Sequence, residues 1–167
     1  MTYRAIVYAW QGIVHADDSA AVEDIERRHG LPVGFIAAAA REPSLYERAT
    51  CGYIDDETWR RAVRNALVRA HGEMAAGAAA EWAALTGAVD EGLVAVAAEA
   101  RGRLRTALLA EASTRLETDL QRFGLDKAFD VVVSTARNGF PLGGPTPVSG
   151  GHRAPGLPAR AVSVRRS

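Results

Sequence analysis

The sequence has a single cysteine, Cys51, a single lysine, Lys127, and no long apolar run. One cysteine excludes an internal disulfide and a zinc cluster built on several cysteines. No stretch approaches the roughly 18 to 20 apolar residues that a membrane-spanning helix needs. The first residues, MTYRAIVYAW, lack the charged start, long apolar centre and cleavage site of a secretory signal. We therefore expect a cytoplasmic protein that has no membrane contact.

Acidic residues are absent from the last part of the chain. No carboxylate side chain follows Asp130, whereas five arginines do: Arg137, Arg153, Arg160, Arg165 and Arg166. The formal net charge of zero therefore combines a body of charge minus five with a basic end. A basic end can contact nucleic acid or an acidic partner. Because this segment is rich in Gly and Pro and poor in aromatic residues, the sequence does not favour nucleic-acid binding.

A short apolar run near the start predicts a buried strand that ends in a sharp turn. Ile6, Val7 and Tyr8 favour a strand, and Gly12 gives the backbone the freedom to turn. In an open α/β fold, ligands and catalytic groups lie at the carboxyl end of such a strand. The residues 9–11, Ala-Trp-Gln, include no acid, base or nucleophile. The stretch thus indicates an enzyme-like scaffold without an evident reaction.

The next seventy residues carry helical patterns and no strand pattern. Helices are predicted over residues 20–29, with Asp17, Asp18 or Ser19 as the cap, and over 33–40. Asp55 or Asp56 can cap a third, which has apolar residues at spacings of three and four. A weaker pattern covers 78–85. These residues predict a helical segment inserted after the first strand.

The second half alternates between helix and strand. Asp90 is expected to cap a helix with Leu93, Val96, Ala97 and Ala100 on one face, and residues 106–110 follow as a strand. The next helix is expected to be capped by Ser113 or Thr114, with Leu116, Leu120 and Phe123 on one face, before a strand at 129–134. This alternation is typical of a parallel sheet with right-handed crossovers.

The predicted fold class is α/β, an incomplete Rossmann-like parallel sheet core with an inserted helical cap. The predicted core comprises residues 1–14 and 88–137, and the predicted cap comprises 15–87. Residues 138–167 form a tail rich in Gly, Pro and Arg that cannot bury a core. Within the tail, only 161–164 has a strand pattern.

Four stretches resemble the haloacid dehalogenase (HAD) superfamily, especially members with a helical cap inserted after the first strand. These stretches are residues 4–14, 52–59, 107–117 and 124–137. The resemblance implies a hydrolase fold. It also implies three catalytic positions: the superfamily has a nucleophilic aspartate, an acid–base aspartate and a hydroxyl residue where this sequence has Ala9, Gln11 and Ala110. A methyl group cannot attack phosphorus or carbon, and glutamine does not ionise.

The remaining catalytic positions implied by the resemblance are also replaced. The superfamily's lysine falls at Leu142, and its pair of metal-binding carboxylates falls at Arg165 and Arg166. Two arginines would repel a divalent cation. Catalytic groups that act as a unit fail together when several of them are lost. We therefore expect no catalytic residue at these positions, no metal and no cofactor.

Four residues beside these positions are candidates for a pocket: Trp10, Gly12, His15 and Glu111. The Trp10 ring could fill the space left by the lost nucleophile, as packing or as a stacking surface for a ligand. His15, with Asp17 and Asp18 nearby, could be a general base or part of a solvated helix start. Glu111 could occupy an anion site or point to solvent.

The sequence therefore favours a catalytically inactive HAD-like protein that acts through an unknown protein partner or as a homodimer. An unpaired edge of the first strand would favour such association. Two alternatives remain open. One is a HAD-like hydrolase with a rebuilt site around His15, Asp17, Asp18 and Glu111. The other is a module that binds a small molecule between cap and core.

Overall fold

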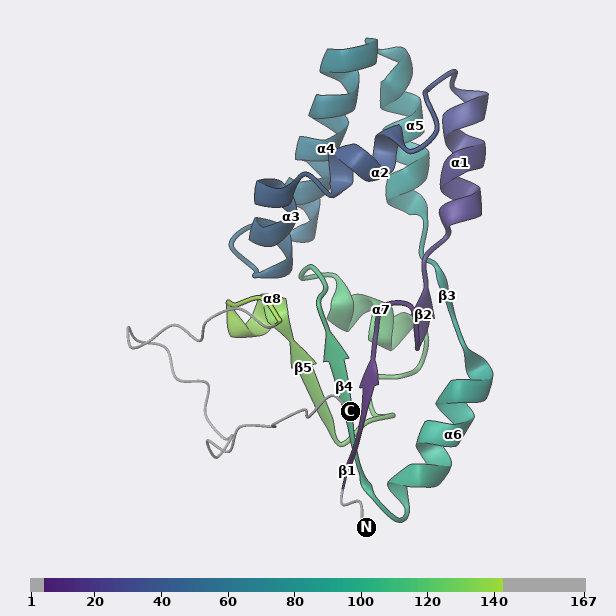
Figure 1. Cartoon of the computed structure of the whole chain (residues 1–167), viewed down its shortest axis with the longest axis vertical. Helices are drawn as coiled ribbons and strands as arrows, with labels where there is room; N and C mark the ends of the chain where they lie inside the picture. The colour runs from purple at the N-terminus through teal and green to yellow at the C-terminus, as the bar shows by residue number, and fades with distance from the viewer. Residues whose placement is uncertain (1–4, 143–167) are drawn as a thin grey trace, which may run out of the picture.

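Three parallel strands form the main sheet in the computed structural model, which describes residues 5–142 (Figure 1). The sheet order is β1-β4-β5, and Val7 lies opposite Ala107, which lies opposite Val131. The strands are β1 (Ala5–Ala9), β4 (Arg105–Ala110) and β5 (Val131–Ser134). The predicted α/β fold with a parallel sheet is thus confirmed. The strand pattern at 161–164 lies outside the described residues.

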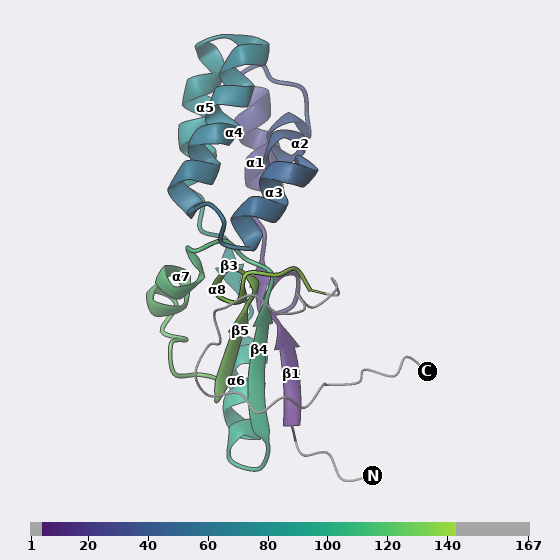
Figure 2. The same cartoon turned by 90° about the vertical axis from the view of Figure 1, so that its left-hand side faces the viewer.

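Two helices cover one face of this sheet. They are α6 (Glu91–Arg101) and α7 (Leu116–Arg122), and Figure 2 shows α6 behind the strands. Tyr8 and Leu108 from the strands pack in one cluster with Ala97 of α6 and Leu120 of α7. Alternation along a strand sends every second side chain to this face, so the cluster follows directly from the apolar pattern.

The opposite face of the sheet remains open at two valines. Val7 of β1 and Val131 of β5 are 54% and 40% exposed. Both belong to one cross-strand row with Ala107 between them. Exposed apolar side chains on one face of a sheet form a surface that another element or another molecule can cover.

Five helices follow one another between β2 and β3 in the described chain, and we call them the helical insert. They are α1 (Ser19–Arg28), α2 (Phe35–Ala40), α3 (Pro43–Thr50), α4 (Asp56–His71) and α5 (Met74–Ala84). A second hydrophobic cluster, which includes Ile25, Ile36, Val63 and Leu67, holds them together. Figure 1 shows the insert above the carboxyl ends of the strands.

The structure adds one helix and one turn that the sequence did not predict. Helix α3 begins with Pro43, and the Glu42 side chain accepts hydrogen bonds from the Ser44 and Leu45 N–H groups at 3.3 and 2.7 Å. Pro at the first helical position and an acidic residue before it are start signals. Helix α8 (Thr135–Asn138) is a single turn after β5, which is too short for a periodic pattern.

A two-stranded antiparallel ladder also escaped the sequence analysis. Strand β2 (His15–Ala16) pairs with β3 (Ala88–Val89), so the chain leaves and rejoins the core at one place. Two residues are too few for a period-two pattern to be visible. The residue boundaries assigned to cap and core, 15–87 against 1–14 and 88–137, stay a prediction.

Three local expectations were wrong. Val96 of α6 is 55% exposed rather than on the buried face. Helix α7 begins at Leu116 after Arg115 and has no side-chain cap. The Ser113 hydroxyl donates to Asp56 in the helical insert at 2.6 Å and accepts the Arg115 N–H at 3.5 Å, one residue before the helix begins. Asp18 precedes α1 but does not cap it, because its carboxylate is used elsewhere.

Asp130 joins β4, β5 and α6 at the amino end of the sheet. Its carboxylate accepts a hydrogen bond from the Thr106 N–H at 2.8 Å and another from Arg101 at 3.3 Å. The Thr106 backbone bond is the main reason that the pKa of Asp130 lies below its ordinary value, and Arg101 lowers it further. Since the folded-state pKa is lowered, this contribution to stability is present above the ordinary pKa. It is lost as the pH falls through the folded-state value.

Candidate functional site

A cleft of about 780 Å³ lies between the carboxyl edge of the sheet and the helical insert. Its core side includes Gln11, after β1, and Glu111, after β4. Its other walls come from α1, α2 and α3, and from the indole rings of Trp59 and Trp82. This edge is where parallel α/β sheets place ligands, so the cleft is the candidate site.

The end of β1 is joined to the end of β4 by the Gln11 side chain. Its amide nitrogen donates to the Glu111 carbonyl oxygen, and its amide oxygen accepts from the Glu111 N–H at 3.2 Å. Both functions of the amide are therefore engaged on the backbone of one residue, an arrangement that we call the Gln11 clamp. The clamp fixes the backbone of Glu111 without using its carboxylate.

The other positions implied by the superfamily resemblance carry hydrocarbon side chains where the structure describes them. Ala9 is exposed at the end of β1, Ala110 is fully buried at the end of β4, and Leu142 is exposed beyond α8. Arg165 and Arg166 lie outside the described residues. At the three described positions there is no nucleophile, hydroxyl group or cation.

Trp10 and Gly12 do not line the cleft as the structure describes it. Trp10 is 4% exposed and belongs to the core cluster on the covered face of the sheet. Its ring stacks on the imidazole of His15, with 4.8 Å between the ring centres. Gly12 lies exposed in the turn after β1 with a φ of 71°. The expectation that the Trp10 ring fills the vacated nucleophile space was wrong, because strand alternation turns it to the opposite side.

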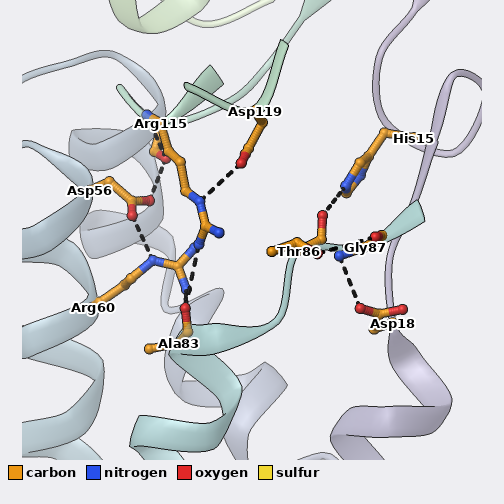
Figure 3. Close-up of polar contacts among 10 residues, drawn as sticks. His15, Asp18, Asp56, Arg60, Ala83, Thr86, Gly87, Arg115 and Asp119 are labelled. Atoms are coloured by element: carbon orange, nitrogen blue, oxygen red, sulfur yellow. Dashed lines mark hydrogen bonds and ion pairs between the residues drawn. The ribbon is translucent and has the colours of Figure 1, made fainter. Parts of the chain in front are cut away.

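His15 and Asp18 line the cleft and fasten the strands that lead into and out of the helical insert. The His15 Nε2 atom lies 2.8 Å from the Thr86 carbonyl oxygen, and the Gly87 N–H donates to Asp18 at 2.9 Å (Figure 3). A carbonyl only accepts, so Nε2 carries the proton. The other ring nitrogen lies 4.0 Å from the Asp17 carboxylate, beyond hydrogen-bond distance.

Asp17 and Glu111 line the same cleft as His15 and Asp18. Asp17 is exposed and lies 3.6 Å from the Arg41 guanidinium. Glu111 is partly buried. The four residues of the rebuilt-site alternative therefore share one cavity. Of these, His15 and Asp18 are bound to backbone groups.

A cluster that the sequence analysis missed closes another side of the cleft. Arg60 of α4 donates to Asp56 at 2.6 Å and to the Ala83 carbonyl at 3.0 Å. Arg115 donates to Asp119 at 3.1 Å and to the same Ala83 carbonyl at 3.4 Å, so two guanidinium groups converge on one oxygen (Figure 3). Opposite charges four residues apart were the available signal.

Burial and acidic neighbours keep two further side chains protonated at neutral pH. Burial raises the pKa of the Tyr46 hydroxyl, and the Glu111 charge raises it further, whereas Arg41 lowers it. Burial also raises the pKa of the Cys51 thiol, with smaller contributions from Glu47 and Glu111. Cys51 is therefore a buried thiol rather than an activated thiolate.

The donor groups at this edge do not fit the Mg²⁺ that phosphatases of the superfamily use. Mg²⁺ prefers carboxylate oxygens in octahedral geometry, but Ala9 offers no ligand, and the Gln11 oxygen is occupied in the clamp. Over residues 5–142, no group of three or more His, Cys, Asp or Glu side chains is placed to hold a metal ion.

No family model and no curated protein matches the chain in sequence, but solved structures resemble it in fold. A predicted HAD-like family hydrolase from Porphyromonas gingivalis superposes with a TM-score of 0.56 at 21% identity, covering 85% of this chain and 71% of that one. The fold is HAD-like.

Two further structures are similar to this chain. An L-2-haloacid dehalogenase from Xanthobacter autotrophicus has 22% identity and a TM-score of 0.49, over 83% of this chain and 59% of that chain. A HAD-superfamily hydrolase of subfamily IA from Geobacter sulfurreducens has 19% identity and a TM-score of 0.44, over 81% and 64%. The chain spans less than two thirds of the length of either. Within the described part, no helix has the length and apolarity to cross a membrane.

Proposed function

We propose that this HAD-like chain is non-catalytic and acts by binding. The observation that carries the proposal is the Gln11 clamp. Where the superfamily resemblance implies an acid–base aspartate, an amide has both of its functions engaged on the Glu111 backbone. With Ala9 two residues earlier, neither of the two superfamily positions at the end of β1 offers a side chain for covalent attack or proton transfer.

The absence of turnover is the first expected result. The full chain, assayed with phosphate monoesters and 2-haloacids with and without Mg²⁺, should give rates no higher than buffer. A His15→Gln variant should give the same rates as the unaltered chain. Turnover that His15→Gln abolishes would contradict the proposal and support the alternative of a rebuilt hydrolase site.

A protein partner or a second copy of the chain is proposed to bind the edge of β1 and the open face of the sheet beside it. Strand β1 is at one edge of the described sheet, and its central residue Val7 is 54% exposed. An edge strand presents unpaired N–H and C=O groups that another strand can join. Val7 of β1 and Val131 of β5 add exposed apolar area to the open face of the sheet.

Self-association should therefore be weakened by a charge at the centre of β1. A Val7→Lys variant should shift the sedimentation of the chain toward the monomer, since lysine on an edge strand opposes strand addition. Ile13→Lys is a matched control, because Ile13 is equally exposed but lies in the turn after β1. A sedimentation coefficient that stays at the monomer value over the accessible concentrations would contradict self-association.

A second candidate function is the binding of a small molecule in the cleft. Its volume of about 780 Å³ falls within the range of ligand pockets. Apolar groups such as Val22, Ala37 and Leu85 share its walls with polar ones. A ligand that binds only the folded chain would raise the midpoint of thermal unfolding.

A further inference from the structure

The carboxylates that line the cleft outnumber the cationic groups that line it. Three guanidinium groups belong to the lining, those of Arg41, Arg60 and Arg115. The carboxylates of the lining are those of Asp17, Asp18, Glu23, Glu26, Glu111 and Asp119. A cleft with such an excess concentrates cations and repels anions, because its low-dielectric walls focus the field.

The three arginines have little capacity left for an anionic ligand. Arg60 and Arg115 each hold a carboxylate and also donate to the Ala83 carbonyl. Arg41 is largely exposed and lies 3.6 Å from Asp17. An anion that entered the cleft would have to compete with these partners, and displacing them would leave partly buried charges unpaired.

Most of the carboxylates are also engaged. Glu26 accepts two backbone N–H groups, Asp18 accepts the Gly87 N–H, and Asp119 is paired with Arg115. Asp17 lies near Arg41, and Glu23 is exposed. Among the described residues, the Glu111 carboxylate has neither a hydrogen-bond donor nor a cation beside it.

Glu111 is held in place although its carboxylate has no partner in the described chain. The Gln11 clamp fixes its N–H and its C=O, so the backbone that carries the side chain is immobilised at the cleft floor. Burial is the main cause that raises the pKa of Tyr46, which lines the cleft from α3, and the Glu111 charge raises that pKa further. The negative potential of Glu111 therefore acts across the cavity.

The wall of the cleft already accommodates one guanidinium group of the protein itself. The Arg60 guanidinium carbon lies 5.1 Å from the ring centre of Trp82 and 5.6 Å from that of Trp59. Aromatic faces attract cations through their quadrupole. Trp59, Trp82 and Tyr46 line the same cleft as Glu111.

We propose that the cleft binds a small organic cation, an amine or guanidinium compound with a short apolar body, whose charged group pairs with Glu111. This inference rests on the second candidate function, ligand binding in the cleft, and names the ligand class. The Gln11 clamp positions the carboxylate, Tyr46 and the indole rings provide the surrounding surface, and the apolar walls cover the hydrocarbon part of the ligand.

The test compares agmatine with inorganic phosphate by titration calorimetry on the full chain. Agmatine should bind and phosphate should not. Glu111→Gln keeps the size of the side chain and the clamped backbone but removes the charge, so it should weaken agmatine binding about tenfold or more. Glu23→Gln, a lining acid that is exposed, is the matched control and should change the affinity by about twofold at most.

Three outcomes overturn the inference: phosphate binds more tightly than agmatine, agmatine does not bind, or Glu111→Gln binds it as the unaltered chain does. The unfolding midpoint of each variant is measured alongside. If Glu111→Gln does not fold, Glu111→Asp, which withdraws the charge by one methylene, replaces it with the same expected direction. These results are independent of turnover, so the inference can fail while the non-catalytic proposal stands.

Discussion

A Gly52→Ala substitution is expected to destabilise the protein by about 3 kcal/mol or more. Gly52 follows α3 with a φ of 72°, a left-handed conformation that disfavours any side chain. A Cβ atom there would also overlap the carbonyl oxygen of Ala136 in α8, which is backbone and cannot rotate away. The free energy of unfolding in urea is the measurement.

Gly30→Ala separates the two causes of that loss. Gly30 has a similar φ of 66°, but a Cβ atom there meets nothing within 4 Å. Only the left-handed conformation is then penalised, and the expected loss is about 1 to 2 kcal/mol. Equal losses for the two variants would show that a Cβ atom at position 52 is accommodated beside α8 at no additional cost.

The second large effect is expected from Glu26→Ala, at about 2 to 5 kcal/mol. Glu26 of α1 is fully buried, and its two carboxylate oxygens each accept a backbone N–H at 2.7 Å, from Gly34 and Ile36. These groups lie at the start of α2, where no intrahelical acceptor is available. Alanine would leave both donors without this partner, and the Ile36 N–H would be buried as well. Urea unfolding measures the loss.

Two variants of α1 test this cause. Glu26→Gln keeps the length and one carbonyl oxygen, so the expected loss is smaller, about 1 to 2 kcal/mol. Glu23→Ala removes an exposed carboxylate from the same helix and should change the free energy of unfolding by about 0.5 kcal/mol at most. If Glu26→Ala were as mild as Glu23→Ala, the buried bonds to α2 would not stabilise the fold.

The sequence predicted those parts of the fold in which one pattern extends over several residues. Strands β1, β4 and β5 are short runs of apolar or β-branched residues, and α4 has an apolar stripe with Asp55 as its cap, which accepts the Thr58 N–H at 2.7 Å. The order of these elements suffices for a parallel sheet. The resemblance to the HAD superfamily indicated the same fold through its local stretches.

The features missed are those that depend on residues far apart in the chain. The Gln11 clamp joins positions 100 residues apart, and the pairing of β2 with β3 closes over the whole helical insert. The convergence of Arg60 and Arg115 on Ala83 needs α4, α5 and the start of α7 to meet. The local periodicity of the sequence does not predict such long-range contacts, because tertiary packing determines them.

The sequence analysis predicted the neighbours of the site better than the orientation of their side chains. His15 and Glu111 line the cleft. Trp10, directly beside the clamp, belongs to the opposite face of the sheet. A change of one position along an extended chain reverses the side, so the exact end of β1 decides which residue reaches the cleft.

The ladder of β2 and β3 determines how the helical insert is able to move. The two strands are neighbours, with His15 opposite Val89 and Ala16 opposite Ala88, and the Gly87 N–H ties them to Asp18. Two adjacent tethers permit rotation about the line through them and oppose sliding. On the far side of the cleft, Ser113 and Arg115 hold Asp56 and Ala83. The Thr114 hydroxyl also accepts the Asp56 N–H, and the Tyr53 hydroxyl donates to the Gly139 carbonyl. Rotation of the insert about the ladder therefore requires all of these bonds to break together.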